Sequence, residues 1–247
     1  DGTSSQNSSQ WRGGFNVDGR NMPEFGISDF ALGSRFIAAL GYRKNWGWGD
    51  RYRTSVSLFY NRQSGDPYSY VYAGSAARNL NNETGSTTEN RSLIWIPENQ
   101  SEINLVNIAG GLTAEEQWEN LETFIEADEY LSANRGSYAA KNGARAPMIS
   151  QLDVRIAQSF VIKTGGKANR FEVSFDVFNF ANLLNPEWGV VYNNPFAYPL
   201  INFVGYESDG TTPRFTFTDS RLGDERFSID DRLSRWRGRL GIRYIFN

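Results

Sequence analysis

The chain has 247 residues, a formal net charge of −3, and neither cysteine nor histidine. The two missing residue types exclude disulfides, thiolate and histidine metal sites, and histidine-based catalytic triads, and the slightly acidic balance argues against a nucleic-acid partner. No stretch approaches the about 18 consecutive apolar residues of a transmembrane helix.

The N-terminal part of the chain predicts a loop followed by a β-hairpin. Residues 1–34 are rich in Gly, Ser and Asn and lack sustained periodicity, so we interpret them as a loop. Apolar and polar residues alternate through 35–63 on both sides of a short turn that contains two tryptophans. This pattern predicts two antiparallel strands.

Residues 64–150 form a long excursion in which one helix is predicted. The excursion begins with the alternating tyrosines Tyr68, Tyr70 and Tyr72, and Trp95 lies in a short apolar strand. Thr113 and Glu116 have the spacing of a capping box, and apolar residues recur after them at helical spacing. We therefore expect a helix near residues 113–131.

The C-terminal part predicts a second hairpin over 151–180, a second excursion over 181–233, and a last strand over 234–247. One face of the last strand is apolar and aromatic, with Trp236, Leu240, Ile242, Tyr244 and Phe246. Its other face carries Arg235, Arg237, Arg239 and Arg243, and the charged residues Asp153, Arg155, Glu172 and Asp176 of the hairpin are predicted to share that side. Carboxylates and guanidinium groups on neighbouring strands can pair across a sheet.

This alternation is typical of a transmembrane β-barrel, whose apolar side chains face lipid and whose polar side chains face a wet lumen. A soluble antiparallel sheet would alternate in the same way. Short turns at one end and long connections at the other match the periplasmic turns and extracellular loops of outer-membrane barrels. We therefore predict an all-β fold of about five long antiparallel strands, the C-terminal part of a large transmembrane β-barrel, with long extracellular loops that contain one short helix.

Five strands cannot close a barrel, and an open edge cannot face lipid because its backbone groups would lack partners. The remaining strands are therefore expected from upstream sequence or from another chain.

Several stretches resemble the C-terminal region of TonB-dependent outer-membrane receptors of the Bacteroidetes group, in particular the Oar-like branch related to SusC-type transporters. They are Leu-Ile-Trp-Ile-Pro-Glu-Asn-Gln-Ser-Glu-Ile-Asn at 93–104, Thr-Ala-Glu-Glu-Gln-Trp at 113–118, the run 130–147, Leu-Asp-Val-Arg-Ile-Ala-Gln at 152–158, Val-Phe-Asn-Phe-Ala-Asn-Leu-Leu-Asn at 177–185, and the last strand. Together these stretches cover most of residues 91–247.

The resemblance implies that the chain is part of an outer-membrane transporter that takes up a solute. It implies a barrel that encloses a plug, a TonB-type energy transducer as partner, and a plug and TonB box that lie upstream of this sequence. A surface lipoprotein is a further implied partner, the long loops would be extracellular, and the C-terminus would be periplasmic. The aromatic residues of the last strand would also be the signal that the barrel-assembly machinery reads, although Asn247 follows Phe246 here.

Candidate ligand contacts are the loop aromatics Tyr68, Tyr70, Tyr72 and Trp95, which have the chemistry to stack on a sugar or peptide. Aromatic residues in hairpins more often pack the hairpin itself. Asp224, Asp230 and Asp231 are candidates for a calcium site, but the sequence predicts neither a metal nor a cofactor. No pair of carboxylates is placed in a cleft, so we expect the chain not to be an enzyme.

Two alternatives to transport stay open at this point. The first is an outer-membrane barrel that acts as a structural or adhesion scaffold, with long loops that bind a surface partner. The second is a soluble, β-rich secreted binding module.

Overall fold

The computed structural model describes residues 14–19, 22, 24–74, 80, 91–193, 195–219 and 221–246, without the side chains of Thr164 and Asp224. The chain divides into two compact units. One comprises Asp1–Ala31, Asp66–Ala146 and Asn194–Phe227, and we call it the mixed unit. The other comprises Leu32–Gly65, Pro147–Asn193 and Ser228–Asn247, and we call it the sheet unit.

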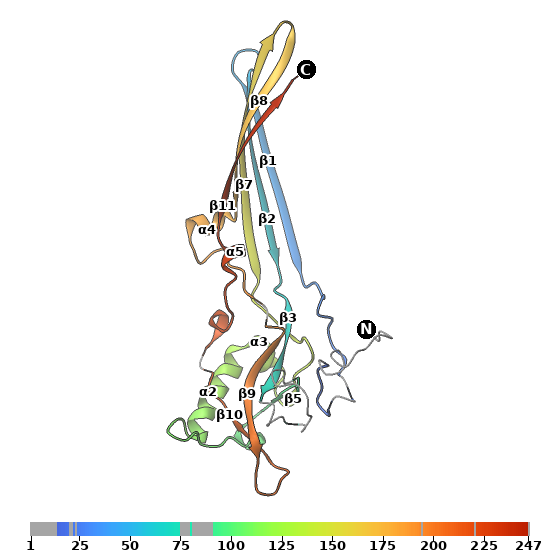
Figure 1. Cartoon of the computed structure of the whole chain (residues 1–247), viewed down its shortest axis with the longest axis vertical. Coiled ribbons are helices and arrows are strands. Elements are labelled where there is room, and N and C mark those ends of the chain that lie inside the picture. Colours follow the sequence, from blue (N-terminus) through green and yellow to red (C-terminus); the bar gives the residue numbers. More distant parts are fainter. Residues whose placement is uncertain are drawn as a thin grey trace. The chain divides into compact units, whose positions relative to one another are not determined.

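The sheet unit is built on five long antiparallel strands in the order β1-β2-β7-β8-β11 (Figure 1). They are β1 (Arg35–Trp46), β2 (Tyr52–Gln63), β7 (Ile149–Thr164), β8 (Lys167–Phe178) and β11 (Arg237–Ile245). Both predicted hairpins form, and the register is continuous along β1–β2 and β2–β7. The order follows the chain, so the sheet is a simple meander whose edge strands are β1 and β11.

Two tight turns join the hairpin strands at the same end of the sheet. The turn between β7 and β8 consists of Gly165 and Gly166, both with positive φ. Such a turn matches the right-handed twist of the flanking strands and strongly favours glycine. Gly47 in the β1–β2 turn also has positive φ, and an added Cβ there would lie 2.5 Å from the ring of Tyr52. These glycines therefore fix where the hairpins reverse.

The last strand is shorter than predicted. Residues Asp231–Ser234 form helix α5, which Asp230 caps by accepting hydrogen bonds from the backbone N–H groups of Arg232 and Leu233. The prediction of a strand from residue 234 was therefore wrong by three residues, because the cap holds the chain in a helical turn before β11. A second short helix, α4 (Phe180–Leu184), follows β8.

The mixed unit shows that the predicted excursions are not simply loops. It contains a four-stranded sheet in the order β10-β9-β3-β6, in which β3 and β9 are parallel. The strands are β10 (Pro213–Thr216), β9 (Ala197–Tyr206), β3 (Pro67–Ala73) and β6 (Ala144–Arg145), and β4 (Trp95–Ile96) pairs with β5 (Ser137–Tyr138). Parts of all three segments predicted as loops, 1–34, 64–150 and 181–233, thus fold together, although residues 1–13 lie outside the described part of the chain.

The predicted helix forms in two pieces, α2 (Ala114–Ala127) and α3 (Glu129–Ala133). The capping box is confirmed, since Thr113 accepts from the N–H of Glu116 while the Glu116 side chain accepts from the N–H of Thr113. Asp128 separates the pieces and caps α3 by accepting from the N–H of Leu131 at 2.8 Å. Two single-turn 3-10 helices, η1 (Gln100–Glu102) and η2 (Gly223–Arg226), complete the elements.

The core of the mixed unit is aromatic and aliphatic. Its fully buried side chains come from β3, β4 and the residues before it, α2, α3, β9 and the segment after β10, and include Tyr68, Tyr70, Phe124, Ile201 and Phe217. None of the helices in the described part of the chain combines the length and the apolar character that a membrane crossing requires.

Candidate functional site

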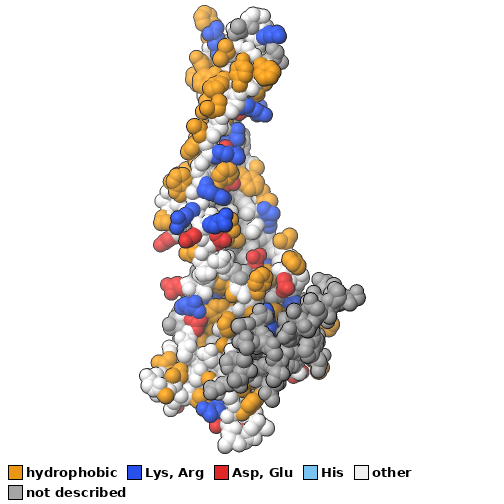
Figure 2. Space-filling model, viewed as in Figure 1, with side chains coloured by type: hydrophobic (Ala, Val, Ile, Leu, Met, Phe, Trp, Pro, Cys, Tyr) orange, Lys and Arg blue, Asp and Glu red, His pale blue; other side chains and the backbone are white. Residues whose placement is uncertain are grey.

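The five-stranded sheet leaves its apolar face exposed, and on its other face only small and carboxylate side chains near the centre are buried. On the apolar face, Leu240 and Ile242 are each 69% exposed. On the opposite face, Ser159 is 2% exposed and Asp176 is 6% exposed. A sheet that packs on the core of a soluble domain buries its apolar side, whereas this sheet leaves large apolar side chains exposed and buries the centre of its charged face. Figure 2 shows hydrophobic side chains gathered around the hairpin turns of the sheet.

One aromatic residue from each strand lies at the same level of this apolar face. The continuous register places Trp46, Tyr52, Phe160, Phe171 and Tyr244 opposite one another across β1, β2, β7, β8 and β11. The first four rings contact each other in sequence, with centroids 4.6 Å apart for Trp46–Tyr52, 5.8 Å for Tyr52–Phe160 and 6.3 Å for Phe160–Phe171. We call this set the aromatic row.

Aromatic residues also occur at a second level, near the other end of the strands. One level of the register contains Leu58, Val154, Val177 and Gly238. Two residues further from the hairpin turns, Tyr60 and Trp236 therefore lie at the same level. Tyr60 contacts Phe36 at 6.3 Å. Tyr60 is eight residues from Tyr52, which corresponds to about 27 Å along the strand.

Three side chains with polar groups on the apolar face, those of Trp46, Thr54 and Gln158, bond to one another. The indole N–H of Trp46 donates to the Thr54 hydroxyl at 2.9 Å, and that hydroxyl donates to the Gln158 carbonyl at 2.6 Å. The Gln158 amide donates in turn to the backbone carbonyl of Ser159 at 3.1 Å. This series of hydrogen bonds satisfies the polar groups without water, as a face packed against apolar surroundings requires.

The predicted charge pairing is present on the polar face. Arg155 lies 3.0 Å from Asp176 and 3.6 Å from Glu172, and Arg239 lies 3.2 Å from Asp176. Glu172 also accepts a hydrogen bond from the Ser159 hydroxyl at 2.9 Å. These contacts link β7, β8 and β11 through side chains as well as through the backbone ladder.

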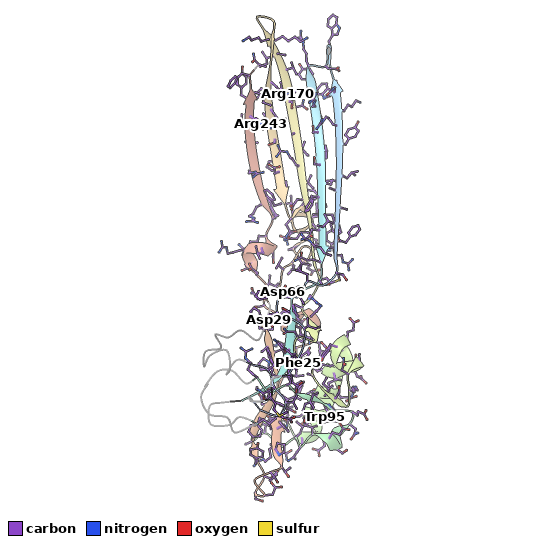
Figure 3. The ribbon with its side chains drawn as sticks, turned by 90° about the vertical axis from the view of Figure 1, so that its right-hand side faces the viewer. Phe25, Asp29, Asp66, Trp95, Arg170 and Arg243 are labelled. Carbon is purple, nitrogen blue, oxygen red and sulfur yellow. The ribbon has the colours of Figure 1, made fainter. Side chains whose placement is uncertain are left out.

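The remaining predicted lumen charges have other surroundings. Asp153 accepts a hydrogen bond from the N–H of Asn179 at 2.8 Å. Arg237 and Arg243 lie on the polar face of the edge strand β11, and Figure 3 shows Arg243 on β11 beside Arg170 on β8. Arg235 was placed wrongly, because it follows α5 rather than lying in the strand, and it pairs with Asp231 at 3.7 Å.

The tyrosines predicted as ligand contacts are buried in the mixed unit. Tyr68, Tyr70 and Tyr72 are at most 5% exposed, and Tyr72 also contributes to the lining of a pocket beside Phe15 and Val71. Tyr68 donates to Tyr70 at 2.9 Å, and Tyr70 donates to Asp128 at 2.7 Å. For Tyr68 and Tyr70 the prediction was wrong, because a strand buried on both faces carries the same alternating tyrosines as an exposed hairpin, whereas for Tyr72 it stays a prediction.

A buried ion pair, which sequence reasoning missed, completes this cluster. The Arg226 guanidinium lies 3.0 Å from the Asp128 carboxylate, and these two side chains are 10% and 8% exposed. The Arg226 guanidinium also lies 5.1 Å from the Phe124 ring centroid and 5.3 Å from that of Phe227. Burial raises the pKa of Tyr68 to about 12 and that of Tyr70 further, so both stay neutral donors. The arrangement stabilises a core and leaves no cavity for a substrate at Asp128 and Arg226.

The other candidates take structural roles or stay predictions. Trp95 is half-buried, and its indole N–H donates to Glu102 at 2.8 Å. Asp230 caps α5 and Asp231 pairs with Arg235, while the side chain of Asp224 lies outside the described part. Within the described residues no three acidic side chains gather where they could hold a metal ion.

Comparison of the chain with models of known families, with curated proteins and with solved structures finds no match.

Proposed function

We propose that the sheet unit is part of the wall of a transmembrane β-barrel in a bacterial outer membrane, and that this barrel takes up a solute. The observation that carries the proposal is the exposed apolar face of the sheet, which lies opposite a face that carries most of the charged residues of the sheet. In a barrel the exposed face would contact lipid and the charged face would line the lumen.

The two aromatic levels support this orientation. Their separation of about 27 Å along the strand becomes about 20 Å along the membrane normal at a strand tilt of about 40°, so both levels would fall within the apolar band of about 25 Å of outer-membrane barrels, near its two margins. Aromatic side chains concentrate at membrane interfaces because they have an apolar body and a polar edge. The aromatic row would mark the interface on the side of the hairpin turns.

The outer edges of β1 and β11 also favour a larger assembly. Within the described residues neither edge pairs with a further strand. In lipid every backbone donor and acceptor needs a partner, so closure would require strands from the rest of the same barrel or from another polypeptide.

Energised uptake is supported by the resemblance of residues 91–247 to TonB-dependent receptors. On this proposal a plug and a TonB-type transducer would supply the moving parts, and a surface lipoprotein would be a further partner. A second candidate is a barrel that serves as a structural or adhesion scaffold. It is favoured by the mixed unit, because a compact unit with its own core presents a fixed surface to a partner.

Quenching of tryptophan fluorescence by brominated phosphatidylcholine tests the membrane assignment. Single-tryptophan variants that retain Trp46 or Trp236 are expected to be quenched, because both residues lie at the aromatic levels of the sheet. Variants that retain Trp95 or Trp118, both in the mixed unit, are the matched controls and are expected to be quenched far less. Equal quenching at all four positions would contradict the assignment.

The transport and scaffold roles can be distinguished by the partner that the protein binds. Crosslinking of the full-length protein in native membranes is expected to capture a TonB-type transducer if the barrel is energised. Failure to capture the transducer, with the quenching result in place, would favour the scaffold.

A further inference from the structure

The polar face of the sheet carries far more positive than negative charge. By register, β1 contributes two arginines to this face, β2 one, β7 an arginine and a lysine, β8 one arginine, and β11 three. Against these nine cations stand three carboxylates, those of Asp153, Glu172 and Asp176. The chain as a whole has a net charge of −3, so the excess is specific to this surface.

The three carboxylates are already engaged. Asp176 is within 3.2 Å of both Arg155 and Arg239, Glu172 faces Arg155 and the Ser159 hydroxyl, and Asp153 accepts from a backbone N–H. Pairing within the sheet therefore accounts for only two of the cations.

Arg43 and Arg53 are the clearest cations without a carboxylate. Arg53 lies on the inner strand β2, and its neighbours in register are the neutral residues Asn45 and Ser159. Its Nε donates to the Asn45 side chain at 2.9 Å, and in the described residues no acidic group lies within ion-pair distance of it or of Arg43. Because Arg53 has a strand on each side, its lack of a carboxylate does not arise from the open edges of the sheet.

The two arginines are close enough to act on one ligand. Arg43 pairs with Ser55 while Arg53 pairs with Asn45, so they are diagonal neighbours, roughly 7–8 Å apart. An anionic group between them would lie about 4 Å from each, well below the Debye length of about 8 Å in physiological salt, and would therefore interact with both. Small residues at the adjoining positions, Ser55, Ser57 and Ala157, leave room above the sheet.

We propose that Arg43 and Arg53 bind an anionic group, a carboxylate or phosphate, of the solute that the barrel takes up. The inference rests on the proposed function, because a confined lumen with low-dielectric walls concentrates the field of these charges. Arg53 would supply a planar fork of donors suited to a carboxylate or phosphate, and Asn45 would hold that fork in place.

Calorimetric titration of the protein in phosphatidylcholine vesicles, with pyrophosphate or citrate as probe, tests the site. The wild-type protein is expected to bind at least one probe, with an affinity that falls as salt rises. Arg53→Gln is expected to weaken binding at least fivefold, and Arg53→Lys, which keeps the charge but not the planar fork, by a smaller factor. Lys44→Gln is the matched control, since Lys44 is adjacent in sequence but lies on the apolar face, and is expected to change binding less than twofold.

Insertion is scored separately by the tryptophan quenching described above. Inserted protein that binds neither probe, or that loses equal affinity in Arg53→Gln and Lys44→Gln, would overturn the anion site and leave the barrel assignment standing. Binding that is lost equally in Arg53→Lys and Arg53→Gln would show that position 53 does not act through its charge. Protein that does not insert would overturn both proposals.

Discussion

Replacing Leu240 by arginine probes the environment of the exposed apolar face. Leu240 lies in register with Phe175, Ile156, Val56 and Tyr42, a level midway between the two aromatic levels. An arginine that faces lipid at the middle of the bilayer costs roughly 2–4 kcal/mol. The same change at a position exposed to water would fall within about 0.5 kcal/mol.

The control is Tyr244→Arg, four residues along the same strand and in the aromatic row. That distance is about 13 Å along the strand, and near the interface the cost of arginine falls to about 0–1 kcal/mol. Leu240→Arg is therefore expected to lower the free energy of unfolding by about 2–3 kcal/mol more than Tyr244→Arg does. A difference of this size changes the folded-to-unfolded ratio by a factor of about 30 to 150.

The assay is equilibrium unfolding in guanidinium of the protein in phosphatidylcholine vesicles, followed by tryptophan fluorescence. The reasoning would be refuted if both substitutions changed the free energy by less than about 0.5 kcal/mol, or if Tyr244→Arg cost as much as Leu240→Arg. The first result would mean that water, not lipid, covers the face, and the second that the cost does not depend on depth.

Two further predictions concern the buried cluster of the mixed unit. Arg226→Met should lower the free energy of unfolding, measured by chemical denaturation, by about 3–5 kcal/mol, because Asp128 would remain buried without its cation. The control is Arg221→Met, which should cost about 1 kcal/mol or less, because the Arg221 side chain is 56% exposed beside its carboxylate partner. Similar costs for the two substitutions would contradict the burial argument. Burial raises the pKa of Tyr68 and of Tyr72 to about 12, so the folded state keeps protons that the unfolded state releases near pH 10, and stability should fall as pH rises from 10 through 12. Tyrosinate absorbance should show these two groups ionising after the exposed tyrosines, and a single step near pH 10 in folded protein would be the opposite result.

The sheet unit could be predicted because its signals are local. Period-two alternation identified β1, β2, β7 and β8, and the structure places the turn of the second hairpin at Gly165-Gly166. The same alternation placed Arg155 and Asp176 on one face, where the structure pairs them. The start of β11 was misplaced because period-two reasoning gave no weight to Asp230, an N-cap residue whose position before α5 is itself a readable signal.

The mixed unit could not be predicted in the same way, because its structure depends on distant segments. The parallel pairing of Ser69 with Ala197 joins residues more than a hundred positions apart, and neither strand shows in its own sequence which partner it takes. Burial of Tyr68 and Tyr70 follows from that pairing and from α2, so their alternation alone did not distinguish a core strand from an exposed hairpin. Arg226 gave no signal, since a lone arginine is most often on the surface.

The division of the chain into interleaved segments has a consequence for folding. The backbone passes between the two units five times, at 31/32, 65/66, 146/147, 193/194 and 227/228, so neither unit is a continuous stretch of sequence. The mixed unit needs β9 and β10 to complete its sheet, and during synthesis these strands follow four of the five long strands of the sheet unit. Contacts of such long sequence separation form slowly, because loop closure has to precede them. Completion of the mixed unit is therefore expected to be a late event in folding. A chaperone that delays collapse of the chain should raise the yield of folded protein.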